Sequence, residues 1–321
     1  MSDCRVYIVL ATCQGEAFLP ELLARIRAQS LSDWTLLARD DRSSDATLRI
    51  LREAAAADPR IVLIEDDRPR FGAAGNFGRL LDEALRRGAD YVLPADQDDV
   101  WHVDKVARQV QALQAAGASS GQATPQLVFC DAQVVDSEGR LLHASFLRQN
   151  RLPYRTDRPL ATLLGRCFAL GCACAANRAL LELALPLPES ITSHDWWLAL
   201  CAAAAGQIVC LDTPLLDYRR HDGNASQAAI WNVFSSHGGW RQRWRLGRDH
   251  FARSLNQARA LSDRLDERKI ASGEPTEMLA EFCRIIDGPN RWRRLWRLHR
   301  LGVPKIGWLR RLLYDLCVLM K

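Results

Sequence analysis

The sequence predicts an α/β protein whose mostly parallel sheet is covered by helices on both faces. Short apolar runs rich in β-branched residues alternate with segments of helical periodicity through the first two thirds of the chain. The chain has 321 residues, of which 48% are hydrophobic and 25% charged, so it is long enough to bury a large core. Polar clusters follow three of the predicted strands, and ligands bind at such strand ends in open sheets of this kind.

The predicted elements follow in chain order. Strands are expected at residues 6–10, 34–38, 61–64, 91–93, 127–135, 171–176 and 208–211. Helices are expected at residues 18–29, 44–57, 75–87, 104–116 and 195–205, and another begins near Asn177. The first of them has amphipathic spacing, with apolar residues at Leu19, Leu22, Leu23 and Ile26. Residues 118–125 are small and polar, and they predict an exposed loop.

The cysteines and the N-terminus indicate the compartment. Ten cysteines are scattered through apolar segments, which favours buried free thiols in a reducing environment. Cys172 and Cys174 form a C-x-C pair, but no His or Cys accompanies it at zinc spacing. The N-terminus shows no basic leader with a cleavage site, and its apolar run is too short to span lipid. We therefore expect a cytoplasmic protein.

The most informative stretch is residues 91–105, YVLPADQDDVWHVDK. An apolar strand ends there in Asp96, Asp98 and Asp99, whose carboxylates repel one another unless they share a cation. Mg²⁺ and Mn²⁺ accept oxygen ligands and bridge carboxylates to phosphates, so a D-x-D at a strand end suits a diphosphate-bearing substrate. The alternative is an acidic surface turn. Asp104 is assigned to the N-cap of the next helix.

Two further loops belong to the same edge of the predicted sheet. In residues 38–47, ARDDRSSDAT, Asp40 and Asp41 can accept hydrogen bonds from a base or a ribose; helix capping alone is the alternative. The loop ATCQGE at residues 11–16 allows backbone to approach a nucleotide. Neither a G-x-G-x-x-G motif nor a P-loop occurs, which disfavours dinucleotide oxidoreductases and P-loop NTPases.

Two later motifs add a base and cations. Residues 193–197, SHDWW, place Asp195 at a helix start beside aromatic rings that can stack on a sugar, and its carboxylate can deprotonate an acceptor hydroxyl. An N-cap followed by core tryptophans fits the same residues equally well. Residues 218–221, YRRH, can stabilise a leaving diphosphate, or they form a solvated basic turn.

In order and spacing, these motifs resemble the family 2 glycosyltransferases of the GT-A fold, particularly the rhamnosyltransferase-like branch that builds bacterial surface polysaccharides. The resemblance covers roughly residues 5–222 and is carried by A-T-x-x-G-E, R-D-D-x-S-x-D-x-T, D-Q-D-D-x-W with a following D-K, H-D-W-W and Y-R-x-H. Cys13 and Gln14 depart from the family pattern. Arg42 stands where the family has a glycine, so the turn must avoid a positive φ or carry its cost.

The resemblance implies binding roles for individual residues. The base and ribose of a nucleotide would be held by Thr12, Glu16, Asp40, Asp41 and Asp96. Asp96 and Asp98 would bind Mg²⁺ or Mn²⁺ and the diphosphate, with His221 nearby as a further ligand.

The resemblance also implies the reaction. Asp195 would be the catalytic base of an inverting transfer from a nucleoside-diphosphate sugar, with dTDP-rhamnose favoured, to a glycan or lipid-linked acceptor. Glu189 is the second choice for the base. A sugar-phosphate nucleotidyltransferase would carry Lys and Arg in a Gly-rich first loop, which ATCQGEAF lacks. A non-catalytic carbohydrate- or membrane-binding module is the other alternative.

The C-terminal end has a composition of its own. The pattern divides the chain into a catalytic domain at residues 1–222 and a helical, Arg/Trp-rich region at residues 223–321. Residues 284–321 hold eight Arg and two Lys against two Asp, although the net charge of the chain is only +5. Arg, Trp and Leu at helical spacing predict an amphipathic helix pair that attaches the protein peripherally to the inner face of the cytoplasmic membrane. The alternative is packing on the catalytic body, and no nucleic-acid partner is expected.

Overall fold

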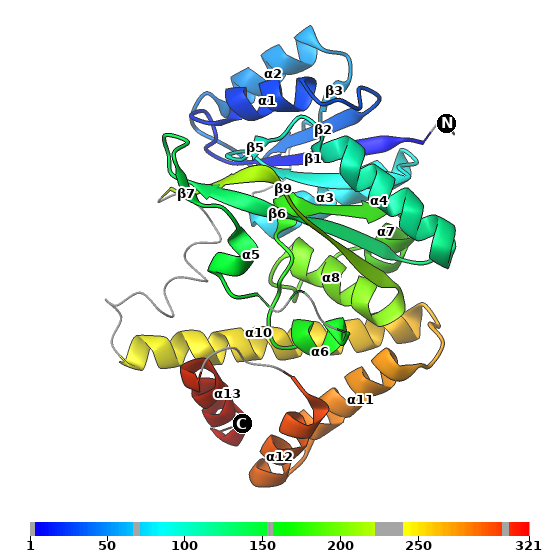
Figure 1. The fold of residues 1–321 in the computed structure, drawn as a ribbon, viewed down its shortest axis with the longest axis vertical. Helices are drawn as coiled ribbons and strands as arrows, with labels where there is room; N and C mark the ends of the chain where they lie inside the picture. The colour runs from blue at the N-terminus through cyan, green and yellow to red at the C-terminus, as the bar shows by residue number, and fades with distance from the viewer. Residues whose placement is uncertain are drawn as a thin grey trace.

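The computed structural model describes residues 4–66, 71–152, 154, 157–221, 240–303 and 308–320, which form an α/β body with helices at its C-terminal end (Figure 1). Within these residues one nine-stranded sheet has the order β3-β2-β1-β4-β8-β6-β9-β5, and β7 pairs with β6. The strands are β1 (Val6–Thr12), β2 (Thr35–Asp40), β3 (Ile61–Leu63), β4 (Tyr91–Asp96), β5 (Val100–Trp101), β6 (Gln126–Val135), β7 (Leu141–His143), β8 (Cys174–Asn177) and β9 (Gln207–Arg219).

The register of the sheet brings the predicted polar loops together. β1 runs parallel to β2 and β4, with Thr12 opposite Asp40 and Ala11 opposite Asp96. β3 and β2, and β6 and β9, are also parallel, whereas β5, β7 and β8 pair antiparallel. The α/β class with a largely parallel sheet and flanking helices is therefore confirmed, and the ends of β1, β2 and β4 meet at one edge.

The helices cover the sheet and extend beyond it. α3 packs on β1 and β2, whereas α4 packs on β4, β6 and β8. The helices are α1 (Leu19–Arg27), α2 (Thr47–Ala57), α3 (Gly72–Arg86), α4 (Lys105–Ser120), α5 (Phe146–Gln149), α6 (Pro159–Leu163), α7 (Arg178–Ala184), α8 (His194–Ala205), α10 (Trp240–Glu267), α11 (Glu274–Asp287), α12 (Arg291–Leu301) and α13 (Trp308–Met320), with a 3-10 turn η1 at Gly171–Ala173.

Most element boundaries differ by a few residues from the sequence prediction, and three of the differences are notable. α4 extends to Ser120, into residues expected to be a loop, and is followed by Gly121, whose φ of +91° favours glycine. The first half of the strand expected at 171–176 is the 3-10 turn η1. β9 runs on to Arg219, so the YRRH motif begins inside the sheet. Asp104 stands at the N-cap of α4 but makes no capping hydrogen bond, and it pairs with Arg108 at 3.6 Å.

Helix α8 is apolar on nearly all sides, and other elements cover nearly all of its surface. Ten of its twelve residues are buried. One side faces β6 and β9, and α10 and α11 cover another. A helix without a polar face is stable in water only when it is enclosed in this way. The C-terminal helices therefore complete the core around α8.

Helix α10 is attached to the α/β body by hydrogen bonds as well as by packing. The buried Arg264 donates to the carbonyl oxygens of Leu183 at 3.0 Å and Pro186 at 2.7 Å. Ser254 donates to the carbonyl of Leu164. The domain boundary expected at residues 222–223 lies outside the described part of the chain, so it stays a prediction.

Both helices of the predicted C-terminal pair bury some residues and expose others, and they differ in the side chains that they expose. In α13, Tyr314, Cys317 and Val318 are buried, and the Tyr314 ring packs edge-on against Phe251 of α10 at 5.2 Å. In α12, by contrast, Trp292 and Trp296 are 64% and 57% exposed. None of the helices in the described ranges combines the length and the hydrophobicity that crossing a bilayer requires.

Candidate active site

The ends of β1 and β2 are joined by a polar network. The hydroxyl of Thr12, which is buried, donates to the Asp40 carboxylate at 3.0 Å. Asp40 also accepts from the backbone N–H of Ser43 at 2.7 Å and from the Ser43 hydroxyl at 2.5 Å. These hydrogen bonds fix Asp40 at the edge of the sheet. The structure thus brings two of the predicted nucleotide-binding residues together.

Two other predicted nucleotide-binding residues are occupied with protein groups. Asp41 is buried, pairs with Arg39 at 3.3 Å, and accepts from the backbone N–H groups of Phe71 and Gly72 at the start of α3. Glu16 is exposed, and its carboxylate accepts from the backbone N–H of residue 46 at the start of α2. Both carboxylates stabilise helix N-termini, where negative charge is favourable.

Two reciprocal hydrogen bonds join the first loop, residues 11–16, to residues 96–99, which we call the aspartate loop. The backbone N–H of Cys13 donates to Gln97 Oε1 at 2.8 Å, and Gln97 Nε2 donates back to the Cys13 carbonyl at 2.8 Å. Gly15 leaves room for this side chain, since a Cβ there would stand 2.4 Å from Gln97 Oε1. Gln14 has a φ of 54° and binds the Ser44 backbone N–H through its side-chain oxygen.

The turn after β2 has a positive φ, so it carries the conformational cost that a residue with a Cβ pays there. Arg42, which replaces the family's glycine, has a φ of 60°. This left-handed conformation costs roughly 1–2 kcal/mol for a residue with a Cβ. The carboxylates around the turn are nevertheless in place, so the substitution changes strain rather than chemistry.

Asp98 and His221 meet although 123 residues separate them. His221 Nε2 lies 2.8 Å from Asp98 Oδ2. The buried Arg219 holds the Asp98 loop from beneath, because its Nε donates to the Asp98 carbonyl at 3.1 Å and its Nη2 pairs with Glu21 at 2.7 Å. Arg219 therefore supports the loop, and its guanidinium is committed to protein partners.

Asp96 and Asp195 share one electrostatic environment. Burial, followed by the charges of Asp98 and Asp195, raises the pKa of Asp96 to about 7. Asp195 accepts from the backbone N–H of Trp196 through one oxygen, and its other oxygen has no hydrogen-bond partner among the residues described. A carboxylate with a free oxygen beside the aspartate loop is placed to accept a proton.

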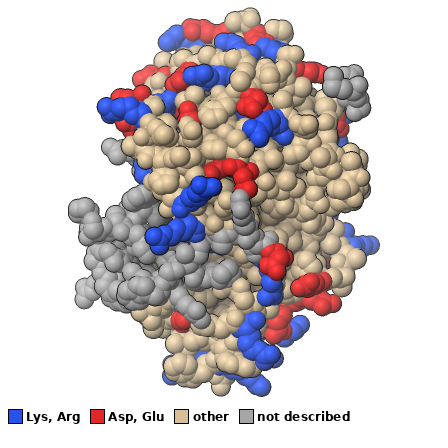
Figure 2. Space-filling view, viewed as in Figure 1, with Lys and Arg blue, Asp and Glu red and all other residues tan. Residues whose placement is uncertain are grey.

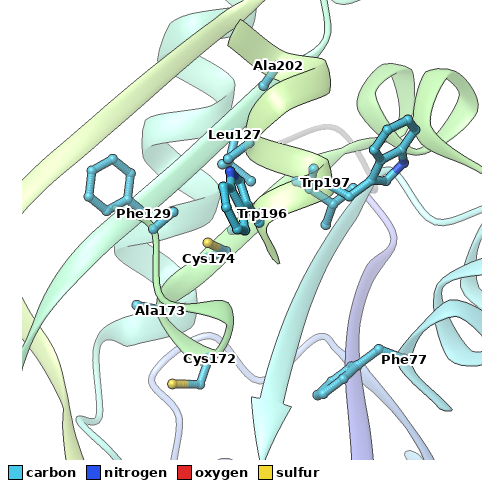
Figure 3. Close-up of a cluster of buried hydrophobic side chains, with 14 of the residues drawn as sticks. Phe77, Leu127, Phe129, Cys172, Ala173, Cys174, Trp196, Trp197 and Ala202 are labelled. Carbon is cyan, nitrogen blue, oxygen red and sulfur yellow. The ribbon is translucent and has the colours of Figure 1, made fainter. Parts of the chain in front are cut away.

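The aromatic rings after Asp195 belong to the core. Trp196 and Trp197 are buried, and their indole N–H groups donate to the carbonyls of Leu163 and Ala184. The prediction that they stack on a sugar is wrong, because α8 turns both rings inward (Figure 3). His194 is buried too and stacks on Phe77 with ring centroids 3.9 Å apart.

The donor set of the aspartate loop fits a divalent cation. Asp96, Asp99 and Cys172 each offer a ligand atom, and the three atoms lie within 4.8 Å of one another. Asp99 is buried, and neither of its carboxylate oxygens has a well-formed hydrogen bond within the described part of the chain. Burial and the charges of Asp98 and Asp96 raise its pKa well above the usual value. Crowded, unpaired carboxylates of this kind are stabilised by a shared cation.

The sequence places Asp99 among the three crowded carboxylates, but the ion was expected on Asp96 and Asp98, and Cys172 was not expected at the site. Asp99 was visible within the D-Q-D-D run, but only the fold shows that it points inward. Cys172 comes from η1, about 75 positions further along the chain, and its C-x-C spacing carried no signal for a site shared with aspartates.

The fold and the site together define a transferase that uses an activated, phosphate-bearing donor at the carboxyl ends of parallel strands. A sequence model described as Glycosyl transferase family 2 matches residues 7–182, which is more than half of the chain. The chain belongs to this family, and it transfers a sugar from a nucleotide sugar.

Relatives and solved structures agree with this assignment. The chain is 27% identical to the dTDP-rhamnosyl transferase RfbG of Shigella flexneri over 69% of this chain and 74% of that protein. It is 30% identical to the UDP-Glc:alpha-D-GlcNAc-diphosphoundecaprenol beta-1,3-glucosyltransferase WfgD of Escherichia coli over 34% of this chain and 41% of that one.

Two solved structures share the fold at low sequence identity. S. aureus TarS 1-349 in complex with UDP-GlcNAc aligns with a TM-score of 0.55 and 15% identity, over 98% of this chain and 90% of that one. The mannosyltransferase PcManGT from Pyrobaculum calidifontis, in complex with GDP-Man and Mn²⁺, aligns with a TM-score of 0.53 and 17% identity, over 98% and 86%. The GT-A-like fold expected from the sequence is thereby confirmed.

Proposed function

We propose that the protein is an inverting, metal-dependent glycosyltransferase that passes a sugar from a nucleoside diphosphate to a hydroxyl of a glycan or lipid-linked acceptor. The observation that carries this proposal is the closeness of Asp195 to Asp96, where the charge of one carboxylate helps to raise the pKa of the other to about 7. A base for the acceptor thus faces the loop expected to hold the donor.

The donor side of the site is assigned to the ends of β1, β2 and β4. Thr12 and Asp40 would contact the base and ribose, and Asp96 would contact the ribose and the ion. Glu16 and Asp41 were expected to join them, but their present hydrogen bonds favour a supporting role for the two loops.

The ion is assigned to Asp96 and Asp98, with His221 beside them. When bound, Mg²⁺ or Mn²⁺ supplies positive charge that offsets the developing charge on the leaving diphosphate. The Mn²⁺ in the PcManGT structure supports this assignment at the level of the fold. Arg219 keeps Asp98 in position from below, and His221 orients its carboxylate through the 2.8 Å contact.

Asp195 is assigned the proton transfer. As the acceptor oxygen attacks the anomeric carbon, its proton moves to the free carboxylate oxygen of Asp195, and the nucleoside diphosphate leaves from the opposite face. The configuration at the anomeric carbon is thereby inverted. Placement at the start of α8, with the chain fixed by Trp196 and Trp197 in the core, restricts how the carboxylate can move.

Two substitutions separate the roles of donor and base. Asp98→Ala is expected to abolish metal-dependent donor binding, measured by calorimetry with a panel of nucleotide sugars. Asp195→Asn is expected to keep donor affinity and to lose ~10²–10⁴-fold of transfer rate, as is usual when a general base is removed. Glu189→Gln serves as the matched control. Wild-type transfer by Asp195→Asn would move the base elsewhere, with Glu189 the next candidate.

The donor is proposed to be dTDP-rhamnose on the similarity to RfbG. Release of nucleoside diphosphate from dTDP-rhamnose, UDP-glucose and GDP-mannose, with and without Mn²⁺, tests this choice. Turnover of another donor would change the sugar and leave the mechanism intact. Absence of metal-dependent turnover or binding with every donor would favour a binding module instead.

The place of action is proposed to be the inner face of the cytoplasmic membrane, through the exposed side of α12. This helix has five arginines and no acidic residue, and Trp292 and Trp296 stand one turn apart in water. Basic side chains line the lower edge of the molecule in Figure 2, where α12 lies in Figure 1. Exposed indoles among arginines suit the interface of an anionic bilayer.

Vesicle sedimentation tests this surface. Trp292→Ala with Trp296→Ala should release the protein from vesicles rich in phosphatidylglycerol. The matched control is Leu141→Ala with Leu142→Ala on β7, two residues that are 58% and 50% exposed. This variant should bind as the wild type does. Equal binding by the tryptophan variant would refute the proposal, and retention on RNA in place of vesicles would give the surface another partner.

A further inference from the structure

Cys172 differs from the other buried cysteines around it. The thiols of Cys130, Cys167 and Cys174 each donate to a backbone carbonyl, those of Ala173, Ala169 and Leu170. Cys172 makes no such bond, and its thiol instead faces the carboxylates of Asp96 and Asp99. In Figure 3, Cys174 lies beside Trp196 in the apolar cluster, whereas Cys172 lies at the other end of the 3-10 turn.

Asp99 supplies the second observation. Its side chain is 1% exposed, both oxygens lack a well-formed hydrogen bond in the described ranges, and one of them lies in the group formed with Asp96 and Cys172. Only the Cys172 thiol and the Arg219 backbone interact with it as hydrogen-bond groups. A carboxylate buried with so little compensation costs several kcal/mol unless it is neutralised. The Asp99 carboxylate is therefore stabilised when it takes up a proton or binds a cation.

The buried ammonium of Lys105 does not neutralise Asp99. Lys105 is buried, but its ammonium donates to Gln109 Oε1 at 2.7 Å and lies over the Trp101 ring at 3.8 Å. Within the described residues it forms no ion pair within 4.0 Å of Asp99, although the two charges interact at longer range. The Asp98 carboxylate is likewise engaged, by His221. Asp99 and Cys172 are thus left facing each other and Asp96.

We propose that Asp96, Asp99 and Cys172 form an inner site for a thiophilic divalent cation, such as Zn²⁺ or Co²⁺, next to the donor site and sharing Asp96 with it. The inference rests on the metal-dependent transfer proposed above. On binding, the Cys172 thiol loses its proton to solvent and the thiolate becomes a ligand. Two carboxylates and a thiolate favour these ions over Mg²⁺, which takes oxygen ligands almost exclusively.

Sharing Asp96 has a consequence for the reaction. An ion in the inner site draws the Asp96 carboxylate inward, away from the ribose and the ion of the donor. Zn²⁺ should therefore inhibit transfer that is supported by Mg²⁺. The same inhibition should be lost when the thiol is removed, because oxygen ligands alone hold Zn²⁺ less well at this position.

Cobalt spectroscopy of the full chain tests the site without any turnover. One equivalent of Co²⁺ should give the near-ultraviolet absorption of thiolate-to-cobalt charge transfer. Cys172→Ser should lose this band and bind Co²⁺ at least about 10- to 100-fold more weakly, the usual range even for an outer-shell partner. Cys174→Ser, equally buried two residues away, is the matched control and should keep the band.

The remaining variants separate this proposal from the proposed function. Asp98→Ala should keep the cobalt band while donor binding is lost, and thermal unfolding checks that each variant is folded. No cobalt binding at one equivalent, or an unchanged band in folded Cys172→Ser, would overturn the inner site and leave the donor site untouched. A cobalt band in a protein that turns over no donor would uphold the inner site and reject the glycosyl transfer.

Discussion

Gly15 provides a direct test of how the donor loop is held to the aspartate loop. A Cβ at this position would stand 2.4 Å from Oε1 and 2.7 Å from the amide carbon of Gln97. Neither distance is tolerable, so Gly15→Ala must push the Gln97 amide aside. Because the obstacle is the end of a flexible side chain, the backbone is expected to keep its course.

The loss of stability in Gly15→Ala comes from the hydrogen bonds that the displaced Gln97 amide no longer makes. Gln97 exchanges two hydrogen bonds with the backbone of Cys13, each 2.8 Å long. A net contribution of about 0.5–1.5 kcal/mol for each bond gives a loss of about 1–3 kcal/mol for the pair. For domains of about 150–250 residues, each kcal/mol lowers the Tm by roughly 2–4 °C. The first loop should also lose its fixed distance to the aspartates, which weakens donor binding.

A double-mutant cycle isolates this interaction. Gly15→Ala, Gln97→Ala and the double variant are compared by thermal unfolding and by calorimetric titration with the nucleotide. Gly15→Ala should be costly in the wild-type background and nearly neutral once Gln97 is alanine, because the obstacle and its hydrogen bonds are then already absent. Equal losses in both backgrounds would refute the reasoning and place the cost in the loop backbone.

Two further substitutions test the loops around the site. The hydrogen bond that His102 makes to the Asp217 carboxylate raises the pKa of His102. The pair therefore stabilises β5 against β9 below the unfolded pKa of about 6.5, and this stabilisation is lost as the pH rises through the folded pKa. Asp217→Asn should reduce the pH-dependent part of the free energy of unfolding by about 0.2–1 kcal/mol. An unchanged pH dependence of unfolding between about pH 5 and about pH 9 would contradict this expectation. Arg42→Gly should be more stable than Arg42→Ala by up to about 1 kcal/mol in urea unfolding, because glycine accepts the φ of 60° without strain and alanine does not. A glycine variant that is no more stable than the alanine variant would show that the turn carries no strain.

The part of the fold that the sequence predicts well is the part that local signals specify. β1, β2 and β4 are buried on both faces, so they read as continuous apolar runs that end in polar residues. The helix near Asn177 begins where its amide side chain accepts from the Leu180 backbone N–H. The antiparallel insertion of β8 between β4 and β6 depends on pairing between distant segments, and no local pattern indicates it.

The same distinction applies to the site. Thr12, Asp40 and Asp96 were predictable because they end neighbouring parallel strands, and the contact of His221 with Asp98 followed from motif order. The inward direction of Asp99 and its closeness to Cys172 depend on how η1 packs beneath the aspartate loop. Motif spacing also could not show that Asp41 and Glu16 bind helix N-termini, since a carboxylate near a nucleotide and a carboxylate at a helix start look alike in sequence.

The position of Asp195 depends on helices that lie outside the predicted catalytic domain. α8 has ten buried residues, and α10 and α11 cover the side that the sheet does not. Arg264 of α10 and Arg268, just after this helix, donate to the carbonyls of Leu183 in α7 and of Leu185 and Pro186, which follow it. Deleting residues 223–321 should therefore expose an apolar helix and give an aggregating protein, whereas deleting residues 289–321 removes α12 and α13 but keeps this support. A monomeric fragment of residues 1–222 that binds the donor would show that α8 and Asp195 do not need support from α10 and α11.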